Sequence, residues 1–430
     1  MTAPLAVSIL NRDGAGWDAT VAEVRTRLGG GENLLLFPHH YLVATFPKIG
    51  GEIVRFSGDG EVRAFGFLFP RGLCDDGRRV YTLRYHEVVE GGRDDGCYGR
   101  GGVADGVRHA LDDVGALVDG AKVVFYDPSR PHRFAPSGHR LSTHLDLGAP
   151  SESEALAIRE AQAAIWGAAQ DGLYPTDLHS IGFGAGTTLV ARRDGELIGF
   201  LFGFHRFAGS VLPPAWAALY GSELRLESQL LGVQAAARKG GIGFLLKCAQ
   251  AEDAREQGVG IVNWTVDPLQ FSNAVLNFGR LRAVAFDFYP EHYTFRNRLN
   301  QVAASRFGMT WLVSSKRVRT ALAAERGRAI VDLRGDMTIP RLNRGGDEPR
   351  LGVDAPTVAI EIPANWTAVQ RDDRDLAVRW RTTTDRLFVQ YLGAEPGRYM
   401  VTGVGQDDAA CFLLAERVTP ELLVAYGEPE

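Results

Sequence analysis

The chain has 430 residues, 45% of them hydrophobic and 23% charged, and its formal net charge is −5. This length predicts roughly two or three domains, each large enough to bury a core of its own. The net charge argues against nucleic acid or an anionic membrane as the main partner, because both favour a broad basic surface. The net charge is compatible with a local basic pocket for a small anion.

Cysteine usage and the N-terminal residues both predict a reduced, cytoplasmic protein. The N-terminal stretch MTAPLAVSILNRDG has no basic residue ahead of its apolar segment, unlike a secretory signal. No run approaches the roughly 18 apolar residues of a membrane span. The cysteines are scattered, without a C-x-x-C pair or metal-type spacing: Cys74, Cys97, Cys248 and Cys411.

The first predicted elements are a hairpin, a glycine-rich hinge and a strand. Asp59-Gly60 is typical of a tight hairpin turn, and the hinge is YGRGGVADGV at 98–107. An apolar strand then ends at Asp127-Pro128. The polar segment 146–155 predicts a domain boundary, with Ser151 and Glu154 at the spacing of a helix capping box.

Strands and helices alternate after this boundary. Ile158, Ala161, Ile165 and Ala168 recur as one buried helical face would. The Asp194-Gly195 turn joins 187–193 and 196–205 into a predicted hairpin. The further predicted elements are a strand at 224–233, a helix at 244–257, a strand at 261–266, a short helix at 272–284 and an aromatic-rich extended segment at 285–293.

Four pairs of features indicate an internal repeat. The second member of each pair lies between 135 and 140 positions after the first. The pairs are Phe37-Pro38 with Tyr174-Pro175, Asp59-Gly60 with Asp194-Gly195, Gly102 with Gly241, and Asp127-Pro128 with Asp267-Pro268. Because the order is the same and the offset nearly constant, we predict two similar α/β domains in tandem.

A charged break rich in glycine and proline, at 341–356, precedes a C-terminal extension. Strands are expected in it at 358–363, 398–404 and 410–416. Five residues at helical spacing predict one face of a helix that packs on the preceding domain: Ala377, Trp380, Thr384, Leu387 and Tyr391.

The segment AARKGGIGFLL at 236–246 places two cations and three glycines between a predicted strand and a predicted helix. A strand that turns through glycines into a helix presents free N–H groups and the positive end of the helix dipole. Arg238 and Lys239 add positive charge, so the loop suits a phosphate or pyrophosphate group. It is neither a P-loop nor a G-x-G-x-x-G loop. The alternative is a connection whose glycines only permit tight packing.

Residues 238–243 fit the Gln/Arg-x-x-Gly-x-Gly/Ala loop of the GNAT acyltransferase superfamily. The runs 266–293 and 360–392 resemble a bacterial branch of predicted GNAT acyltransferases that carries a C-terminal extension. The resemblance covers about 150 to 420, and the first half only weakly. It implies an α/β (α+β) fold of tandem GNAT-like domains, each with a mixed, mostly antiparallel central sheet flanked by helices, plus a C-terminal α/β extension. The predicted boundaries are 1–148, 149–340 and 341–430.

The resemblance also implies that acetyl-CoA or another acyl-CoA binds as co-substrate. The pantetheine would lie along the strand that contains Leu230, and backbone N–H groups there would polarise the thioester carbonyl. The pyrophosphate would bind at 238–243. The implied CoA-binding residues are Leu231, Gly232, Val233, Arg238, Lys239, Gly240, Gly241, Ile242, Gly243 and Asn273.

Direct attack of an amine on the thioester needs a general base, and an acid for the leaving thiolate. Glu227 is the candidate base, since it alternates with Gln229 and Leu231 and so faces the same side of the strand. The alternative is a solvent-facing strand glutamate. The position of the family's tyrosine acid matches Phe278 here, so Tyr289 is our candidate acid, with Tyr293 beside it. The alternative for both is a core aromatic.

Other chemistry-bearing residues give weaker signals. His205, at the end of the hairpin, is expected at the surface or as a cap, and the alternative is that it faces the substrate. Cys248 is expected to be packed. Three histidines lack a companion ligand, so we expect no metal: His132, His139 and His144. In the first half Gly99 replaces the opening arginine or glutamine of the motif, which predicts a degenerate domain without tight CoA binding.

The sequence therefore predicts a cytoplasmic N-acyltransferase that transfers an acetyl or larger group, such as succinyl, to a small-molecule amine. A homodimer is compatible with it, and nucleic acid and membrane are not expected as partners. The alternative is a non-catalytic CoA-binding sensor or scaffold, because the usual tyrosine is missing at Phe278.

Overall fold

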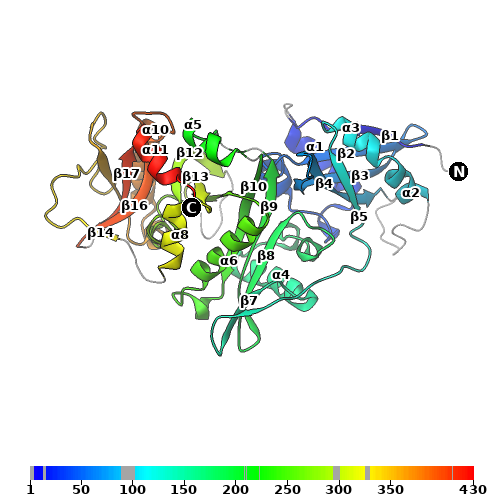
Figure 1. Cartoon of the computed structure of the whole chain (residues 1–430), viewed down its shortest axis with the longest axis horizontal. Coiled ribbons are helices and arrows are strands. Elements are labelled where there is room, and N and C mark those ends of the chain that lie inside the picture. The colour runs from blue at the N-terminus through cyan, green and yellow to red at the C-terminus, as the bar shows by residue number, and fades with distance from the viewer. Residues whose placement is uncertain are drawn as a thin grey trace. The chain divides into compact units, whose positions relative to one another are not determined.

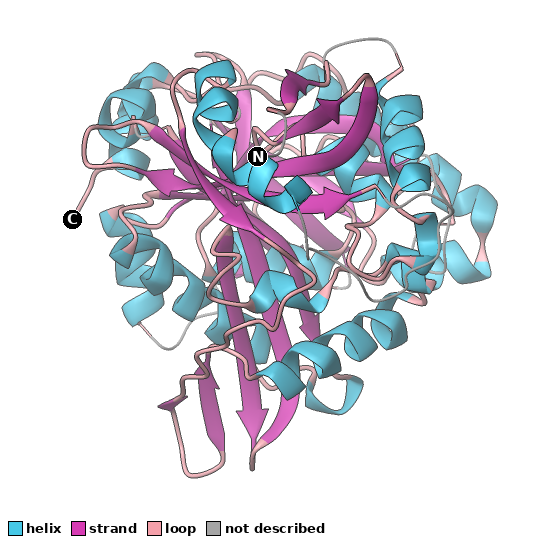
Figure 2. Cartoon of the chain, turned by 90° about the vertical axis from the view of Figure 1, so that its right-hand side faces the viewer, coloured by secondary structure: helices cyan, strands magenta, loops and turns pink. Residues whose placement is uncertain are grey.

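The computed structural model describes residues 4–12, 16–88, 102–207, 209, 211–221, 223–293, 301–324, 330–408 and 410–430. The chain divides into two compact units. Unit 1 comprises Met1–Gly209 and Glu223–Gln250, and unit 2 comprises Ser210–Ser222 and Ala251–Glu430. Helices lie against mixed sheets (Figures 1 and 2), which confirms the predicted mixed α/β class. The division at 148 and 340 stays a prediction.

The first sheet of unit 1 has five strands in sequence order. They are β1 (Ala6–Ile9), β2 (Glu52–Gly58), β3 (Glu61–Leu73), β4 (Arg79–Glu87) and β5 (Lys122–Tyr126). The first four pair antiparallel, whereas β5 runs parallel to β4. A parallel neighbour needs a crossover, and this one contains α2 (Gly102–His109) and α3 (Leu111–Leu117). Helix α1 (Trp17–Arg27) lies between β1 and β2 in the sequence.

The other strands of unit 1 pair antiparallel in the order β6 to β10. They are β6 (His139–Arg140), β7 (Leu145–Gly148), β8 (Gly186–Arg193), β9 (Glu196–Phe207) and β10 (Leu224–Val233). Helix α4 (Glu152–Trp166) follows β7, and α6 (Ile242–Glu256) follows β10. The predicted hairpin between β8 and β9 and the predicted strand at 224–233 are therefore confirmed.

The two hairpin turns have the same backbone conformation. Asp59 and Gly60 have φ of 52° and 81°, and Asp194 and Gly195 have φ of 53° and 84°. Positive φ at both central residues is the type I′ geometry that suits twisted strands. Around these turns the order strand, helix and hairpin occurs twice, as β1, α1, β2 and β3 and again as β7, α4, β8 and β9; α5 separates β9 from β10, whereas β4 follows β3 directly. Duplication of one domain remains our interpretation of this order.

One aromatic core joins the two halves of unit 1. Phe37, Tyr41 and Phe69 from the first half pack with Tyr174 and Phe204 from the second, and all five side chains are buried. Arg84 on β4 forms a buried ion pair with Asp177, with Nη2 2.8 Å from Oδ2. These residues lie on both sides of the boundary predicted at 148. Their packing makes the halves one unit.

Local signals at α4 are confirmed in part. Ser151 caps the helix, and Glu154 completes the predicted capping box. The helix ends at Trp166, with Gly167 in the left-handed region as its C-cap. Ala168, predicted on the helical face, therefore lies beyond the helix, because Gly167 ends it one residue earlier.

Six strands of unit 2 are neighbours in the order β15-β17-β16-β12-β13-β11. Their bounds are β11 (Ile261–Val266), β12 (Val284–Tyr293), β13 (Ala304–Leu312), β15 (Thr357–Ile362), β16 (Tyr399–Asp407) and β17 (Ala410–Arg417). These neighbours are antiparallel, and β14 (Ile330–Asp332) runs parallel to β16. The predicted helix at 272–284 is a short α7 (Phe271–Ala274) continued by a π-helix, Val275–Arg280.

The helices of unit 2 cover these strands. They are α5 (Pro214–Tyr220), α8 (Lys316–Ala323), α9 (Trp366–Asp372), α10 (Arg374–Tyr391) and α11 (Pro420–Gly427). The face predicted for α10 is buried at all five positions. Phe388 of α10 contacts Phe288 and Phe307, with ring centroids 5.2 and 4.7 Å apart. Phe388 thus packs this helix on β12 and β13, whereas packing of the extension on a separate preceding domain stays a prediction.

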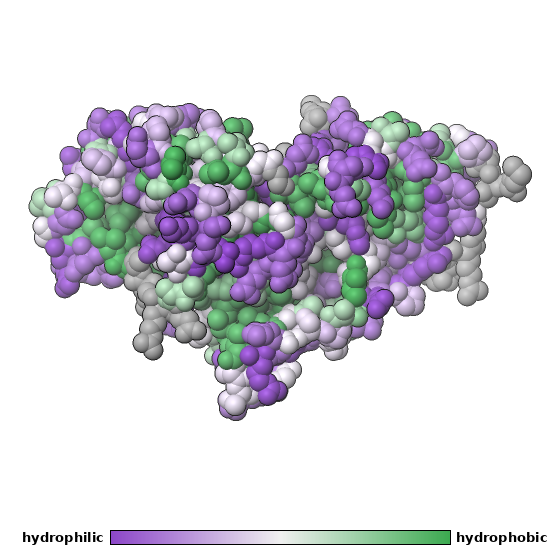
Figure 3. Space-filling view, in the orientation of Figure 1, coloured by the Kyte–Doolittle hydropathy of each residue, from purple (hydrophilic) through white to green (hydrophobic). Residues whose placement is uncertain are grey.

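The surface mixes polar and apolar side chains on the face drawn in Figure 3. No helix in the described ranges is apolar enough, over a sufficient length, to cross a bilayer.

Candidate functional site

The loop between β10 and α6 belongs to unit 1 and is drawn in green in Figure 1. After one turn of 3₁₀-helix at Ala235–Ala237, Lys239 and Gly241 take φ of 66° and 81°. The Gly241 carbonyl accepts from the amides of Phe244 and Leu245 and so begins the helix. The amides of Ile242 and Gly243 belong to the first turn, which has no intrahelical acceptor for them. They are suited to an anion.

Three cations surround these amides. Arg238 and Lys239 are exposed, and Arg238 Nε donates to the carbonyl of Val233 over 3.1 Å. Arg193, at the end of β8, is also exposed, and a Cβ added at Gly240 would lie 3.9 Å from its Nη2. No sequence pattern points to Arg193, because it is 45 or more positions away and only the β8–β9–β10 pairing brings it here.

Strand β10 contains a β-bulge just before the segment predicted to bind pantetheine. Ser228 pairs with Gly203 and Leu230 with Phe202, so Gln229 is an extra residue. A Cβ at Gly203 would lie 2.5 Å from the carbonyl oxygen of Glu227, so only glycine fits opposite the bulge. A bulge turns backbone groups out of the regular ladder.

Because of the bulge, side chains along β10 do not alternate between the two faces as predicted. Glu227 and Leu230 face the aromatic core, whereas Leu231 packs toward α6 with Leu246. Glu227 and Leu231 therefore lie on opposite faces, because the extra residue reverses the alternation. Gln229 does lie with Glu227 on the core side, where its Nε2 donates to Tyr174 Oη over 2.8 Å.

Glu227 is 5% exposed, so the solvent-facing alternative is wrong. Its Oε2 accepts from Arg206 Nη1 at 2.5 Å, and both side chains are buried. Burial is the main reason that the pKa of the Tyr41 phenol is raised. The neighbouring Tyr174 and the charge of Glu227 raise it further. The carboxyl group of Glu227 is therefore anchored by a buried guanidinium.

On the other face of β10 lies Lys247, which the sequence reasoning missed. This α6 residue is 3% exposed, and its Nζ donates to Ser228 Oγ at 2.8 Å and Gln250 Oε1 at 3.1 Å. Burial lowers the pKa of the Lys247 ammonium to about 7, against an opposing effect of Glu227. The sequence did contain a signal for a buried amine here, because Lys247 lies one turn into an otherwise apolar helix face. The residue lies next to the bulge and can hold or release a proton near neutral pH.

The remaining predicted site residues belong to unit 2. Asn273 is exposed on α7, and Tyr289 on β12 is half-buried, with its ring 5.5 Å from that of His292. Phe278 is buried, with its ring 6.4 Å from that of Phe307. The side chain of Tyr293 lies outside the described residues. The loop, the bulged strand and Glu227 are thus brought together within unit 1, and Asn273 and Tyr289 are not part of that unit.

Two expectations about histidines can be compared with the structure. His205 is 5% exposed on β9, so its expectation as a surface residue is wrong. His132 and His144 have separate partners, Tyr126 and Asp194, each at 2.7 Å. Among the described residues no group of three or more His, Cys, Asp or Glu is placed to hold a metal ion. Cys97 and Gly99 lie outside the described residues, so the loop of the first half is described only from Gly102.

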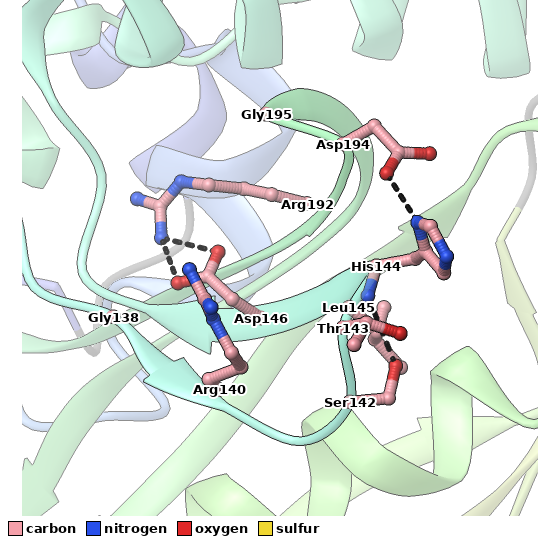
Figure 4. Close-up of a pocket in the computed structure, with 10 residues that line it drawn as sticks. All are labelled: Gly138, Arg140, Ser142, Thr143, His144, Leu145, Asp146, Arg192, Asp194 and Gly195. Carbon is pink, nitrogen blue, oxygen red and sulfur yellow. Dashed lines mark hydrogen bonds and ion pairs between the residues drawn. The ribbon is translucent and has the colours of Figure 1, made fainter.

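A pocket of about 390 Å³ lies in unit 1 beside the β8–β9 turn (Figure 4). Arg192 lines it, but its Nη1 donates to Asp146 at 3.2 Å, and its Nη2 to Glu154 at 2.9 Å. His144 points to Asp194 at the rim (Figure 4). Arg192 and His144 are therefore already paired with carboxylates of the protein.

Neither a protein-family model nor a curated relative matches the chain. Solved structures of acetyltransferases match part of it. A GNAT-family acetyltransferase from Streptococcus pneumoniae is 14% identical, with a TM-score of 0.30, over 39% of this chain and 98% of that one. Arabidopsis thaliana Naa50, in complex with the bisubstrate analogue CoA-Ac-MVNAL, gives the same four values. The Escherichia coli ribosomal-protein-S18-alanine N-acetyltransferase is 10% identical, with a TM-score of 0.30, over 39% and 94%.

Proposed function

We propose that the chain is an acyl-CoA-dependent N-acyltransferase. The observation that carries the proposal is the run from the bulged strand β10, through a loop with exposed cations, into the N-terminus of α6. Such a run offers backbone amides and positive charge to a pyrophosphate at one end. At the other end the bulge offers irregular backbone where a thioester carbonyl needs N–H donors.

The residues of unit 1 fit the co-substrate in two respects. The left-handed Gly241 and the exposed Gly240 leave the helix N-terminus uncovered, and Arg193, Arg238 and Lys239 supply charge around it. We assign the pyrophosphate to 238–243 and the pantetheine to Leu231, Gly232 and Val233. Asn273 is proposed near the pantetheine or the adenine. The acyl-CoA would supply an activated thioester, and the chain's own groups would orient it and manage protons.

The proton-handling residues are proposed as follows. Glu227 is the general base for the acceptor ammonium, held in place by Arg206. Tyr289 is the acid for the leaving thiolate, since the position of the usual tyrosine holds the buried Phe278. The acceptor is proposed to be a small-molecule amine, with the N-terminus of a peptide as the second class to be tested.

The loop assignment is tested by CoA binding in a calorimeter. Gly241→Asp adds a side chain and a negative charge at the loop, and we expect the Kd for CoA to rise by about tenfold or more. Gly60→Asp is the matched control, since both glycines have φ of 81° and open space at the Cβ position. The strain of an aspartate is therefore the same at both sites. An unchanged Kd for Gly241→Asp would exclude this loop as the site.

Turnover is tested by release of free thiol from acetyl-CoA and succinyl-CoA, with panels of amines and short peptides. Glu227→Gln should lower kcat with little change in the Kd for CoA. A second candidate function, a non-catalytic CoA sensor, is motivated by the buried Phe278. Saturable CoA binding without turnover on any acceptor would support that sensor.

A further inference from the structure

Unit 2 contains a second pocket, of about 550 Å³, which the acyl-CoA proposal does not use. Helix α10 forms one wall, and Pro290, Glu291, Val302 and Ala303, next to the ends of β12 and β13, form another. This volume is in the range of pockets that hold small ligands. All of its lining residues belong to unit 2.

Two buried charged side chains of α10 line the pocket. Arg381 is 5% exposed, stacks on Trp366, and uses its Nη2 to donate to Asp267 at 2.9 Å. Asp385 Oδ2 accepts from Ser305 Oγ at 2.5 Å. Each side chain is therefore held in place by one of its polar atoms.

The other polar atoms of this pair make no hydrogen bond among the described residues. Arg381 Nη1 and Nε and Asp385 Oδ1 make no hydrogen bond to any residue that the structure describes. Nη1 and Oδ1 lie 3.9 Å apart, which is too far for a hydrogen bond between them. Buried polar atoms rarely lack a hydrogen bond, so this widely spaced donor and acceptor point to a ligand with one group for each.

The rim of the pocket is aliphatic. Leu351, Val378 and Val389 line it and are 45%, 47% and 59% exposed. Aliphatic side chains that gather at a pocket above buried charges are suited to the apolar arm of a ligand.

The backbone at Glu291 is held in an unfavourable conformation at the same place. Glu291 has φ of 49°, and the pairing of β12 with β13 is irregular between Tyr289 and Tyr293. Its amide donates to Ser305 Oγ at 3.2 Å, which itself donates to Asp385. Strained residues of this kind concentrate at ligand sites. Here the strain positions the hydroxyl that orients Asp385.

We propose that this pocket binds a free α-amino acid with an aliphatic side chain. The ligand's carboxylate would accept from Arg381 Nη1, and its ammonium would donate to Asp385 Oδ1. An α-amino acid carries these two groups on one carbon, so both can reach protein atoms that are 3.9 Å apart. Its side chain would lie against Val378, Val389 and Leu351.

The charges around the pair favour a zwitterion over a simple ion. A monoanion would meet Asp385 and Glu291, and a simple amine would leave Arg381 unsatisfied. The pKa of the Asp385 carboxyl is raised to about 6, chiefly by burial, with Arg381 opposing. A bound ammonium would offset this burial, which is consistent with the orientation assigned to the ligand.

The test is calorimetric titration of the full chain, without acyl-CoA, using three probes. L-leucine is the zwitterion, isopentylamine lacks its carboxylate, and 4-methylpentanoate lacks its ammonium. We expect saturable binding of L-leucine, with the other two weaker by about tenfold or more, because each loses a charge-assisted pair. No binding of L-leucine at millimolar concentration, or equal binding of all three, would overturn the proposal.

Two variants separate this pocket from any other leucine site. Asp385→Asn keeps the shape and the acceptor for Ser305 but removes the charge, and it should weaken leucine binding about tenfold. Val389→Trp should block the pocket, whereas Val424→Trp, on an exposed valine of α11 that does not line it, should not. If both pocket variants bind leucine as the unsubstituted chain does, the site is excluded. The inference is independent of the proposed transferase activity, which thiol release measures separately.

Discussion

Lys247 predicts an unusual dependence of stability on pH. Its ammonium is 3% exposed, and the two groups to which it donates, on Ser228 and Gln250, are neutral. Burial lowers its pKa from 10.5 to about 7. Between these two values the unfolded chain binds the proton and the folded chain does not. The destabilisation is therefore fully present below pH 7 and disappears as the pH rises toward 10.5.

The size of the effect follows from proton linkage. The slope reaches about 1.4 kcal/mol per pH unit between the two pKa values. From about pH 6 to about pH 9 the free energy of unfolding should therefore gain roughly 3 kcal/mol from this residue alone. Lys247→Met keeps an unbranched side chain of similar length but cannot titrate. The variant should be more stable than the unsubstituted chain at the acidic end, and the difference should shrink by roughly 3 kcal/mol at the alkaline end.

Urea unfolding followed by circular dichroism, at several pH values, measures this difference. Lys122→Met is the matched control, since Lys122 is an exposed lysine of the same unit. Its pH profile should run parallel to that of the unsubstituted chain. If the Lys247→Met profile is parallel too, the amine is charged in the folded state and the reasoning is refuted.

Three further predictions concern other contacts. Glu227→Leu should destabilise the fold by roughly 3 kcal/mol, because it leaves Arg206 buried without its partner. In thermal unfolding, the double variant Arg206→Met, Glu227→Leu should recover most of this loss. Additive losses of stability from the two substitutions would contradict the ion pair. Asp177→Asn should destabilise unit 1 by a similar roughly 3 kcal/mol through Arg84, and a loss below roughly 1 kcal/mol in urea would argue against a shared core. Ser151→Ala should lower the free energy of unfolding by about 1 kcal/mol through loss of the cap, whereas the exposed Ser153→Ala should leave it nearly unchanged.

Local patterns predicted the elements near the candidate site well. Asp194-Gly195 set the β8–β9 turn, because only a few residues accept positive φ at both central positions. The apolar run at 224–233 and the glycine loop predicted a strand that leads into a helix, and the structure has both. Ser151 with Glu154 predicted the start of α4. Each of these signals acts within a few residues along the chain.

Features that depend on distant residues were missed or wrongly predicted. The bulge at Gln229 is set by the close approach of Gly203, so alternation along β10 alone put Leu231 on the wrong face. Arg193 reaches the loop only through strand pairing, and the burial of Lys247 depends on how α6 packs.

The sequence by itself predicted the β8–β9 hairpin, the capping box that begins α4, and the strand and helix on either side of the cationic loop at 238–243. Only the tertiary structure decided that Glu227 pairs with Arg206, that Arg84 and Asp177 join the two halves, and that Arg381 and Asp385 share a pocket. The reason is physical. Turn and cap energies arise between near neighbours, whereas burial and charge pairing depend on which distant segments pack together.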